Sequence, residues 1–255
     1  MAYRLLPSVP PMLAPPNLVE ALPRSLRSGL VPTHPTPTTT RGLQLPRALL
    51  CDLDGTLIDT MPILADLATE VLEAVYGMPR VLGRETYLAT SGLPFWRQLE
   101  AICPGDSRNA DAAERFERGK PSRCRSARMA LDTRRVLGDL QARGVEIVVS
   151  SNNGVENVEA FASASEFPFD LVLGHDGNGF GKGRPHIDHV TRTFGVGRED
   201  MLFVGDSLHD GELAEREGLR FVGVTGTFSK ERFALRFPHA PLVDRFSQLA
   251  ALLAS

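Results

Sequence analysis

Residues 49–60 read LLCDLDGTLIDT, an apolar run that leads into two acids, Asp52 and Asp54, and then into Gly55 and Thr56. The apolar run predicts a buried strand, and residues i and i+2 of a strand share one face. Where the strand ends and the chain turns, both carboxylates can reach the same small volume. Like charges so close together repel unless a cation or a proton lies between them.

Two interpretations of this pentapeptide are about equally good when it is taken alone. The first is a magnesium-assisted carboxylate nucleophile, Asp52, with Asp54 as its acid/base partner. The second is an ordinary junction between a strand and a turn, because Asp and Gly are common turn residues. Motifs further along the chain must decide between the two.

The composition of the chain limits its class. With 255 residues it can bury one good core and a smaller second unit, and its net charge of −3 gives no electrostatic reason to expect nucleic acid or a membrane as a partner. No apolar stretch reaches the length of a membrane span. The three cysteines, Cys51, Cys103 and Cys124, have neither metal-site nor disulfide spacing, which favours the cytoplasm.

Residues 1–46 differ from the rest, with ten prolines and a single acidic residue, Glu20. A segment of this kind cannot bury enough apolar surface to offset its ordering entropy, so we expect a disordered extension or an overcalled start. Its Arg and Ser content weakly suggests an organelle transit peptide as an alternative.

From residue 47 onward, short apolar runs alternate with helical periodicity. This order predicts an α/β fold with a doubly wound parallel sheet, a Rossmann-like core made of residues 47–60 and 123–255. The predicted strands are 48–53, 145–150, 170–173, 201–204, 221–224 and a weak sixth at 242–243. The predicted helices of this core are 125–142, 155–165, 187–194 and 208–217.

Residues 61–122 are too many for a single crossover and predict a small all-helical insertion directly after the two acids. Helical spacing of apolar residues is clear up to Gly77, and further helices are predicted at 94–102 and 109–118. The loop at 90–92 and the polar pair Arg97 and Gln98 are candidates for substrate contact.

The run DLDGTLIDT resembles the first motif of the haloacid dehalogenase superfamily of hydrolases that form an aspartyl phosphate. The resemblance implies Asp52 as the nucleophile and Asp54 as the general acid/base, with Gly55 and Thr56 beside the bound phosphate. It also implies that the insertion at 61–122 is a cap that closes over the site.

A second motif is expected at the end of the strand IVVS, residues 147–150, where Ser150 is followed by Ser151 and Asn152. The resemblance implies that Ser151 binds phosphate with Asn152 beside it, whereas Ser150 is one residue out of register and points to the other face. Alone, these residues are explained better as an N-cap of the next helix.

Lys182, in the glycine-rich stretch 177–186, resembles the family's third motif and is then implied to balance the charge of the nucleophile and the phosphoryl group. Of the three lysines it is the one in the right place, since Lys120 falls in the insertion and Lys230 follows every motif. In the family this lysine usually precedes a proline directly, whereas here Gly183 follows it and the proline comes at Pro185.

The run 202–210, LFVGDSLHD, resembles the fourth motif. It implies Asp206 as a direct Mg²⁺ ligand and Asp210 as a ligand or its anchor, with Asp52 and the backbone carbonyl of Asp54 completing the set. Carboxylates, carbonyls and water are the ligands that Mg²⁺ prefers.

Together the motifs predict a Mg²⁺-dependent phosphomonoester hydrolase that acts on a small phosphorylated metabolite. Asp54 argues against a dehalogenase, which lacks an acid at that position, and Lys120 lies too far along the insertion for a phosphonate-cleaving enzyme. A sugar phosphomutase keeps the same residues and stays the alternative. A catalytically silent binding protein on this fold is the other hypothesis, although none of Asp52, Asp54, Lys182 and Asp206 is lost.

Overall fold

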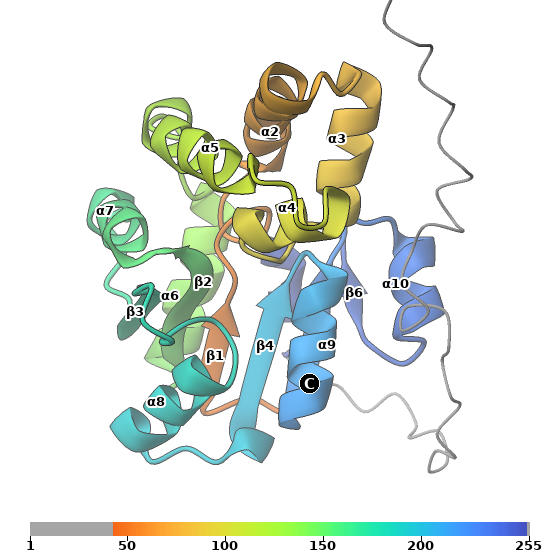
Figure 1. The fold of residues 1–255 in the computed structure, drawn as a ribbon. Helices are drawn as coiled ribbons and strands as arrows, with labels where there is room; N and C mark the ends of the chain where they lie inside the picture. Colours follow the sequence, from red (N-terminus) through yellow and green to blue (C-terminus); the bar gives the residue numbers. More distant parts are fainter. Residues whose placement is uncertain (1–42, 254–255) are drawn as a thin grey trace, which may run out of the picture. The chain divides into compact units, whose positions relative to one another are not determined.

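The computed structural model describes residues 43–253. The expectation for the extension therefore lies, up to residue 42, outside the described residues. Six parallel strands form one sheet in the order β3-β2-β1-β4-β5-β6, which is the order of a doubly wound, Rossmann-like fold and confirms the predicted class (Figure 1). The strands are β1 (Ala48–Cys51), β2 (Glu146–Gly154), β3 (Leu171–His175), β4 (Met201–Gly205), β5 (Arg220–Val224) and β6 (Leu242–Val243).

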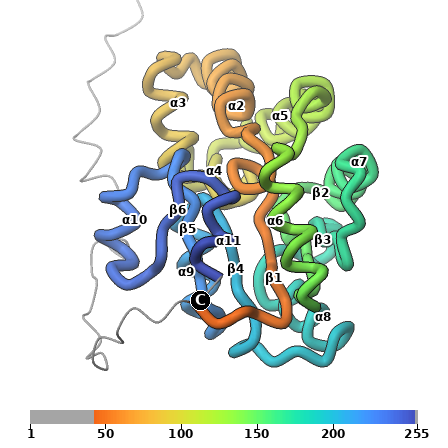
Figure 2. The backbone as a smooth tube through the Cα atoms, turned by 180° about the vertical axis from the view of Figure 1, so that it is seen from behind, coloured from red at the N-terminus to blue at the C-terminus, as the bar shows by residue number. Residues whose placement is uncertain are grey.

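The sheet is covered by helices on both faces. The helices α8 (Arg184–Phe194) and α9 (Leu208–Glu217) lie in front of it in Figure 1, whereas α6 (Leu131–Ala142) and α11 (Leu249–Leu252) lie on the face that Figure 2 shows. The helix α7 (Val155–Ser165) follows β2 and α10 (Lys230–Arg236) follows β5.

Alternation along the strands divides the core into two layers. Leu49 and Cys51 of β1 pack with α6, whereas Ala48 and Leu50 pack with α8 and α9. All four of these side chains are fully buried. A strand buried on both faces reads as a continuous apolar run, and that is why the sequence identified β1 so readily.

Four further helices stand beyond the carboxyl ends of the strands, at the top of Figure 1. They are α2 (Met61–Tyr76), α3 (Arg80–Ala89), α4 (Phe95–Ile102) and α5 (Asn109–Arg123). They share a hydrophobic cluster of their own, in which the rings of Phe95 and Phe116 stack with centroids 4.0 Å apart. Their function as a cap stays a prediction.

Several predicted bounds were wrong. The helix α6 begins at Leu131 and not at residue 125, because Ala130 is extended, with ψ at 147°. The helix α3 was not predicted; it begins after Pro79 without a side-chain cap and has Gly83 in its interior. The helix α10 was also missed.

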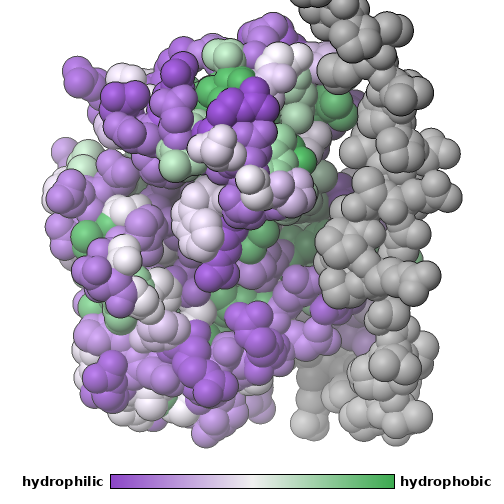
Figure 3. All heavy atoms as spheres, in the orientation of Figure 1, coloured by the Kyte–Doolittle hydropathy of each residue, from purple (hydrophilic) through white to green (hydrophobic). Residues whose placement is uncertain are grey.

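The surface of the described residues is mainly hydrophilic, with scattered apolar patches on the face in Figure 3. Among residues 43–253, no helix combines the length and the apolar character that crossing a membrane requires.

Candidate active site

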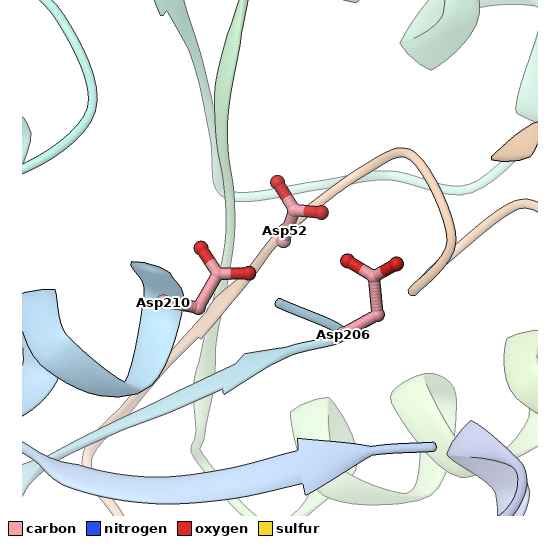
Figure 4. Close-up of side chains that lie close together, drawn as sticks. All are labelled: Asp52, Asp206 and Asp210. Atoms are coloured by element: carbon pink, nitrogen blue, oxygen red, sulfur yellow. The ribbon is translucent and has the colours of Figure 1, made fainter. Parts of the chain in front are cut away.

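Three acidic residues from the carboxyl edge of the sheet meet at one point. Asp52 follows β1, Asp206 follows β4, and Asp210 lies in the first turn of α9 (Figure 4). One oxygen from each carboxylate lies within 4.8 Å of the other two. The strands β1 and β4 are neighbours where the strand order reverses, and open α/β sheets bind their ligands in the crevice at that point.

The start of α9 fixes Asp210. Ser207 is the N-cap and accepts a hydrogen bond from the Asp210 amide at 3.1 Å, while Asp210 Oδ2 accepts from the Ser207 hydroxyl at 2.7 Å and from its amide at 3.2 Å. This capping box satisfies two amides at the start of the helix. It leaves Asp210 Oδ1 pointing back toward Asp52.

Lys182 lies between the acids. Its Nζ is 2.5 Å from Asp52 Oδ1 and 2.5 Å from Asp210 Oδ1, and its side chain is only 2% exposed. Burial alone would lower the pKa of the lysine, but Asp210 and Asp52 together raise it, so the ammonium stays charged. The residue belongs to the loop between β3 and α8 and not to a strand end.

The cluster holds more negative than positive charge. Burial raises the pKa of Asp52 to about 7 against the opposing effect of Lys182, and burial followed by repulsion from Asp52 raises the pKa of Asp206 well above its usual range. Asp210 Oδ1 is buried and, apart from its ion pair with Lys182, has no aligned donor. One ammonium cannot neutralise three carboxylates, so the charge balance of the cluster favours binding of a divalent cation.

The turn after Asp52 brings its backbone close to Asp206. Gly55 has a φ of +83°, and a Cβ at this position would lie 2.0 Å from Asp206 Oδ2, so the site requires glycine here. Thr56 donates from Oγ1 to Asp52 Oδ2 at 3.5 Å. Asp206 is held in turn by the hydroxyl of Thr227, from the loop after β5.

Asp54 stands apart from the three clustered acids. Its Oδ1 accepts from the Thr60 hydroxyl at 2.5 Å, and its Oδ2 accepts from the side-chain amide of Asn153. Thr60 is the N-cap of α2, but its hydroxyl serves Asp54 and makes no cap hydrogen bond. This separation from Asp206 and Asp210 is compatible with a role in proton transfer.

The last residues of β2 divide their roles in a way that the sequence did not predict. Ser151 is buried at the site, and its hydroxyl oxygen accepts a hydrogen bond from the backbone N–H of Asn153 at 3.1 Å. Asn152, the expected phosphate neighbour, donates from Nδ2 to the Gly92 carbonyl at 2.7 Å and so joins the core to the loop between α3 and α4. Asn153 was missed, although it shares the face of Ser151 by the same i, i+2 rule that links Asp52 and Asp54.

Ser150 points to the other face, as the register predicted. Its hydroxyl lies 2.9 Å from Nδ1 of His186, whose Nε2 lies 3.1 Å from the Gly174 carbonyl. His186 is fully buried in the first turn of α8. His209, beside Asp210 in the first turn of α9, is half-buried.

A cavity of about 70 Å³ lies over the acids and is roofed by the helices α2–α5. The loop predicted to face it contributes Ser91 and Gly92. Gln98 lines it as well, is 3% exposed and donates to the Leu93 carbonyl, whereas Arg97 does not line it. Tyr87, Phe95, Phe116, Glu117 and Lys120 complete the part of the roof that the sequence left unassigned.

Comparison with known proteins identifies the family of the chain. The family model for haloacid dehalogenase-like hydrolases matches residues 49–224. A phosphoglycolate phosphatase of Pectobacterium atrosepticum is 29% identical over 219 residues, covering 81% of this chain and 92% of that protein. The phosphoglycolate phosphatase of Escherichia coli is 29% identical over 212 residues, covering 70% of this chain and 81% of that protein.

Solved structures share the fold. A hydrolase from Pseudomonas syringae superposes with a TM-score of 0.69 at 17% identity, over 80% of this chain and 97% of that one. CbbY from Rhodobacter sphaeroides, solved in complex with phosphate, superposes with a TM-score of 0.64 at 22% identity, over 82% and 100%.

The chain therefore belongs to the haloacid dehalogenase-like hydrolase family. The curated relatives are named as phosphatases, which confirms the prediction of a phosphatase-type hydrolase.

Proposed function

We propose that this protein is a Mg²⁺-dependent phosphatase that hydrolyses a small phosphomonoester through an aspartyl phosphate on Asp52. The observation that carries the proposal is the buried cluster of Asp52, Asp206 and Asp210 with Lys182 inside it. A buried lysine between carboxylates is costly to build for stability alone, because the charges must leave water. Perturbed ionisable groups in a cleft are typical of a reaction centre.

The residues fit Mg²⁺. The donors are hard carboxylate oxygens, one of them a buried Asp210 oxygen without an aligned hydrogen bond. When all three acids are ionised, the cluster has two negative charges more than Lys182 balances, and a divalent cation would compensate them. Asp52, Asp206 and the Asp54 backbone carbonyl would hold the ion, and Asp210 would bind it or orient it. When bound, the ion would supply charge neutralisation for the phosphoryl oxygens and the nucleophile.

The reaction is assigned to side chains as follows. An oxygen of Asp52 attacks phosphorus, and the bond from phosphorus to the leaving oxygen breaks as Asp54 gives that oxygen a proton. Asp54 then takes a proton from a water molecule, whose oxygen attacks the phosphorus and releases phosphate and free Asp52. Asp52 thus carries the aspartyl phosphate, and Asp54 transfers a proton both when this intermediate forms and when it is hydrolysed.

Other residues orient the phosphoryl group. Lys182 favours the ionised form of Asp52 and is placed to attract phosphoryl oxygens, and the Ser151 hydroxyl lines the same cavity. The backbone N–H groups of Gly55 and Thr56, expected beside the phosphate, donate within their own turn to the carbonyls of Ile58 and Leu53. Asn152 joins the core to the loop at Gly92, so we assign it a role in holding that loop and not a direct phosphate contact.

Residues 61–122 are proposed to form a substrate-selecting cap that excludes water. The cavity beneath it is small, so a small metabolite is the class of substrate that we propose. Phosphoglycolate is the first candidate, because it is named as the substrate of the relatives. The three free cysteines favour a reducing compartment, and we propose the cytoplasm.

The test is turnover of p-nitrophenyl phosphate and phosphoglycolate with and without Mg²⁺, by the wild type and by Asp52→Asn. Release of phosphate that needs the metal and disappears in the variant is expected. Folded wild-type protein without turnover of any phosphorylated metabolite would support a silent binding protein. Conversion of a hexose 1-phosphate to an isomer without release of phosphate would identify a phosphomutase.

A further inference from the structure

A lysine of the helical insertion reaches the core acid Asp54 through one intervening side chain. Lys120 Nζ on α5 contacts Asn153 Oδ1 near the end of β2, and Asn153 Nδ2 donates to Asp54 Oδ2. These three residues form what we call the Lys120 relay. Thr60 holds the other oxygen of Asp54 at 2.5 Å, so both carboxylate oxygens have a donor.

Lys120 is held in this position by the packing of α5. Its side chain is only 13% exposed, and its other contacts are Glu117 at 3.5 Å and the ring of Phe116 at 5.3 Å from the ring centroid. The preceding residue, Gly119, packs on Leu67 of α2 so closely that a Cβ would lie 2.8 Å from Leu67 Cδ1. Fixing and partly burying a lysine costs side-chain entropy and solvation, so contacts specific to this site must offset that cost.

The relay also forms a wall. A second cavity of about 360 Å³, largely apolar, lies between the end of α5 and α7. Asp54, Lys120 and Asn153 are the residues that line both this cavity and the one over the acids. Loss of the Lys120 or Asn153 side chain would therefore join the two cavities and admit solvent to Asp54 from the second cavity.

We propose that Lys120 and Asn153 are positioning residues for Asp54, through which the helices α2–α5 set the orientation of the acid/base. This inference rests on the proposed function. The ammonium draws electron density from the Asn153 carbonyl oxygen, and this strengthens the hydrogen bond that the amide gives to Asp54. A carboxyl fixed at both oxygens is aimed at the leaving oxygen and not free to rotate.

The step that depends on this orientation is proton donation to the leaving group. As the bond from phosphorus to oxygen breaks, the proton moves from Asp54 to that oxygen, and the electron pair of the broken bond stays with it. A nitrophenolate leaves without much help, whereas a phenolate is a stronger base and needs the proton. Misplacing Asp54 must therefore affect phenyl phosphate more than p-nitrophenyl phosphate, although the two substrates have nearly the same shape.

The experiment compares kcat/KM for these two substrates in Lys120→Met, Asn153→Leu and the wild type, all in excess Mg²⁺. A charge-assisted hydrogen bond is worth about 1.5–3 kcal/mol, so kcat/KM for phenyl phosphate should fall by roughly 10–100-fold. For p-nitrophenyl phosphate the fall should be less than roughly threefold, by the same arithmetic. Lys120→Arg, which keeps the charge, should restore most of the loss.

Arg123→Met is the matched control. It removes a cation from the same end of α5. That cation, however, forms an exposed ion pair with Glu70 at 2.6 Å and is not part of the Lys120 relay. The ratio of the two kcat/KM values should stay at the wild-type value. If Asn153→Leu does not fold, Asn153→Ser removes the same amide with a smaller change.

An unchanged ratio in both Lys120→Met and the Asn153 variant overturns the inference. So does an equal loss for both substrates that lies entirely in KM, since Lys120 would then contact the substrate itself. The proposed function fails separately, through an inactive wild type or an active Asp52→Asn, and neither result resembles a changed ratio among active variants.

Discussion

The buried lysine gives the sharpest test of the electrostatics of the site. In Lys182→Met a side chain of similar length replaces the ammonium, and three buried carboxylates are left with no cation. Removing one partner from a buried ion pair costs about 3–5 kcal/mol, because the charge that remains is uncompensated. For a chain of this size we expect the melting temperature to fall by roughly 6–20 °C at pH 8 without metal.

The loss should depend on pH in a defined direction. Lys182 lowers the pKa of Asp52, which burial raises to about 7, so without the lysine the carboxyl binds its proton at higher pH. At pH 6 the acids of the variant are protonated to a larger extent and repel one another less. The destabilisation relative to the wild type is therefore smaller at pH 6 and grows as the pH rises toward 8.

Thermal unfolding followed by circular dichroism measures both effects. Lys230→Met is the control, because Lys230 is exposed at the first residue of α10 and should change the melting temperature little. Added Mg²⁺ should stabilise Lys182→Met more than the wild type, since the ion replaces part of the missing charge. A melting temperature within about 2 °C of the wild type at pH 8 would refute the charge balance argued here.

Two further predictions follow from single residues. In Gly92→Ala the new Cβ would lie 2.3 Å from Ser207 Oγ, so the loop must move away from the core. We expect kcat/KM to fall by roughly tenfold. Gly77→Ala, which is also at positive φ but has nothing within 4 Å of the new Cβ, should keep full activity. An unchanged kcat/KM in Gly92→Ala would show that the loop does not need this close contact. The pKa of His186 is lowered to about 4, chiefly by burial, so its neutral form contributes stability above its unfolded pKa that is lost as the pH falls toward 4. Between pH 7.5 and pH 5 the wild type should lose about 2 kcal/mol more than His186→Gln in urea unfolding, and parallel curves for the two proteins would contradict the shift.

Sequence patterns predicted the core well where periodicity and end signals agree. The bounds of α7 and α9 match the prediction, because Gly154 and Ser207 stand just before their first turns. The helix α9 also has a buried face that repeats at helical spacing. Prediction failed at α3, which begins after Pro79 without a side-chain cap and carries Gly83 in its interior, so its start and end signals are weak.

The residues of the site likewise divide into those that the sequence predicted and those that it missed. Asp52, Asp206 and Lys182 could be chosen because each follows a recognisable pattern, and the structure brings them together. Asn153 could have been found from its spacing to Ser151. The register of β2 against β3 shifts after Ser150, however, and the way in which the next residues turn is not visible in a pattern of residue types.

The sequence by itself determined the sheet, the order of its elements and the acids at its edge, because strand alternation and parallel connections act over short stretches and admit few topologies. Only the tertiary structure decided that Thr60 and Asn153 hold Asp54, that Asn152 fastens the loop at Gly92, and that Lys120 enters the site from the insertion. These contacts join residues between 6 and 99 positions apart. Their geometry depends on how α2–α5 pack above the sheet, and that packing is set by the shape of a whole hydrophobic cluster and not by any local run of residues.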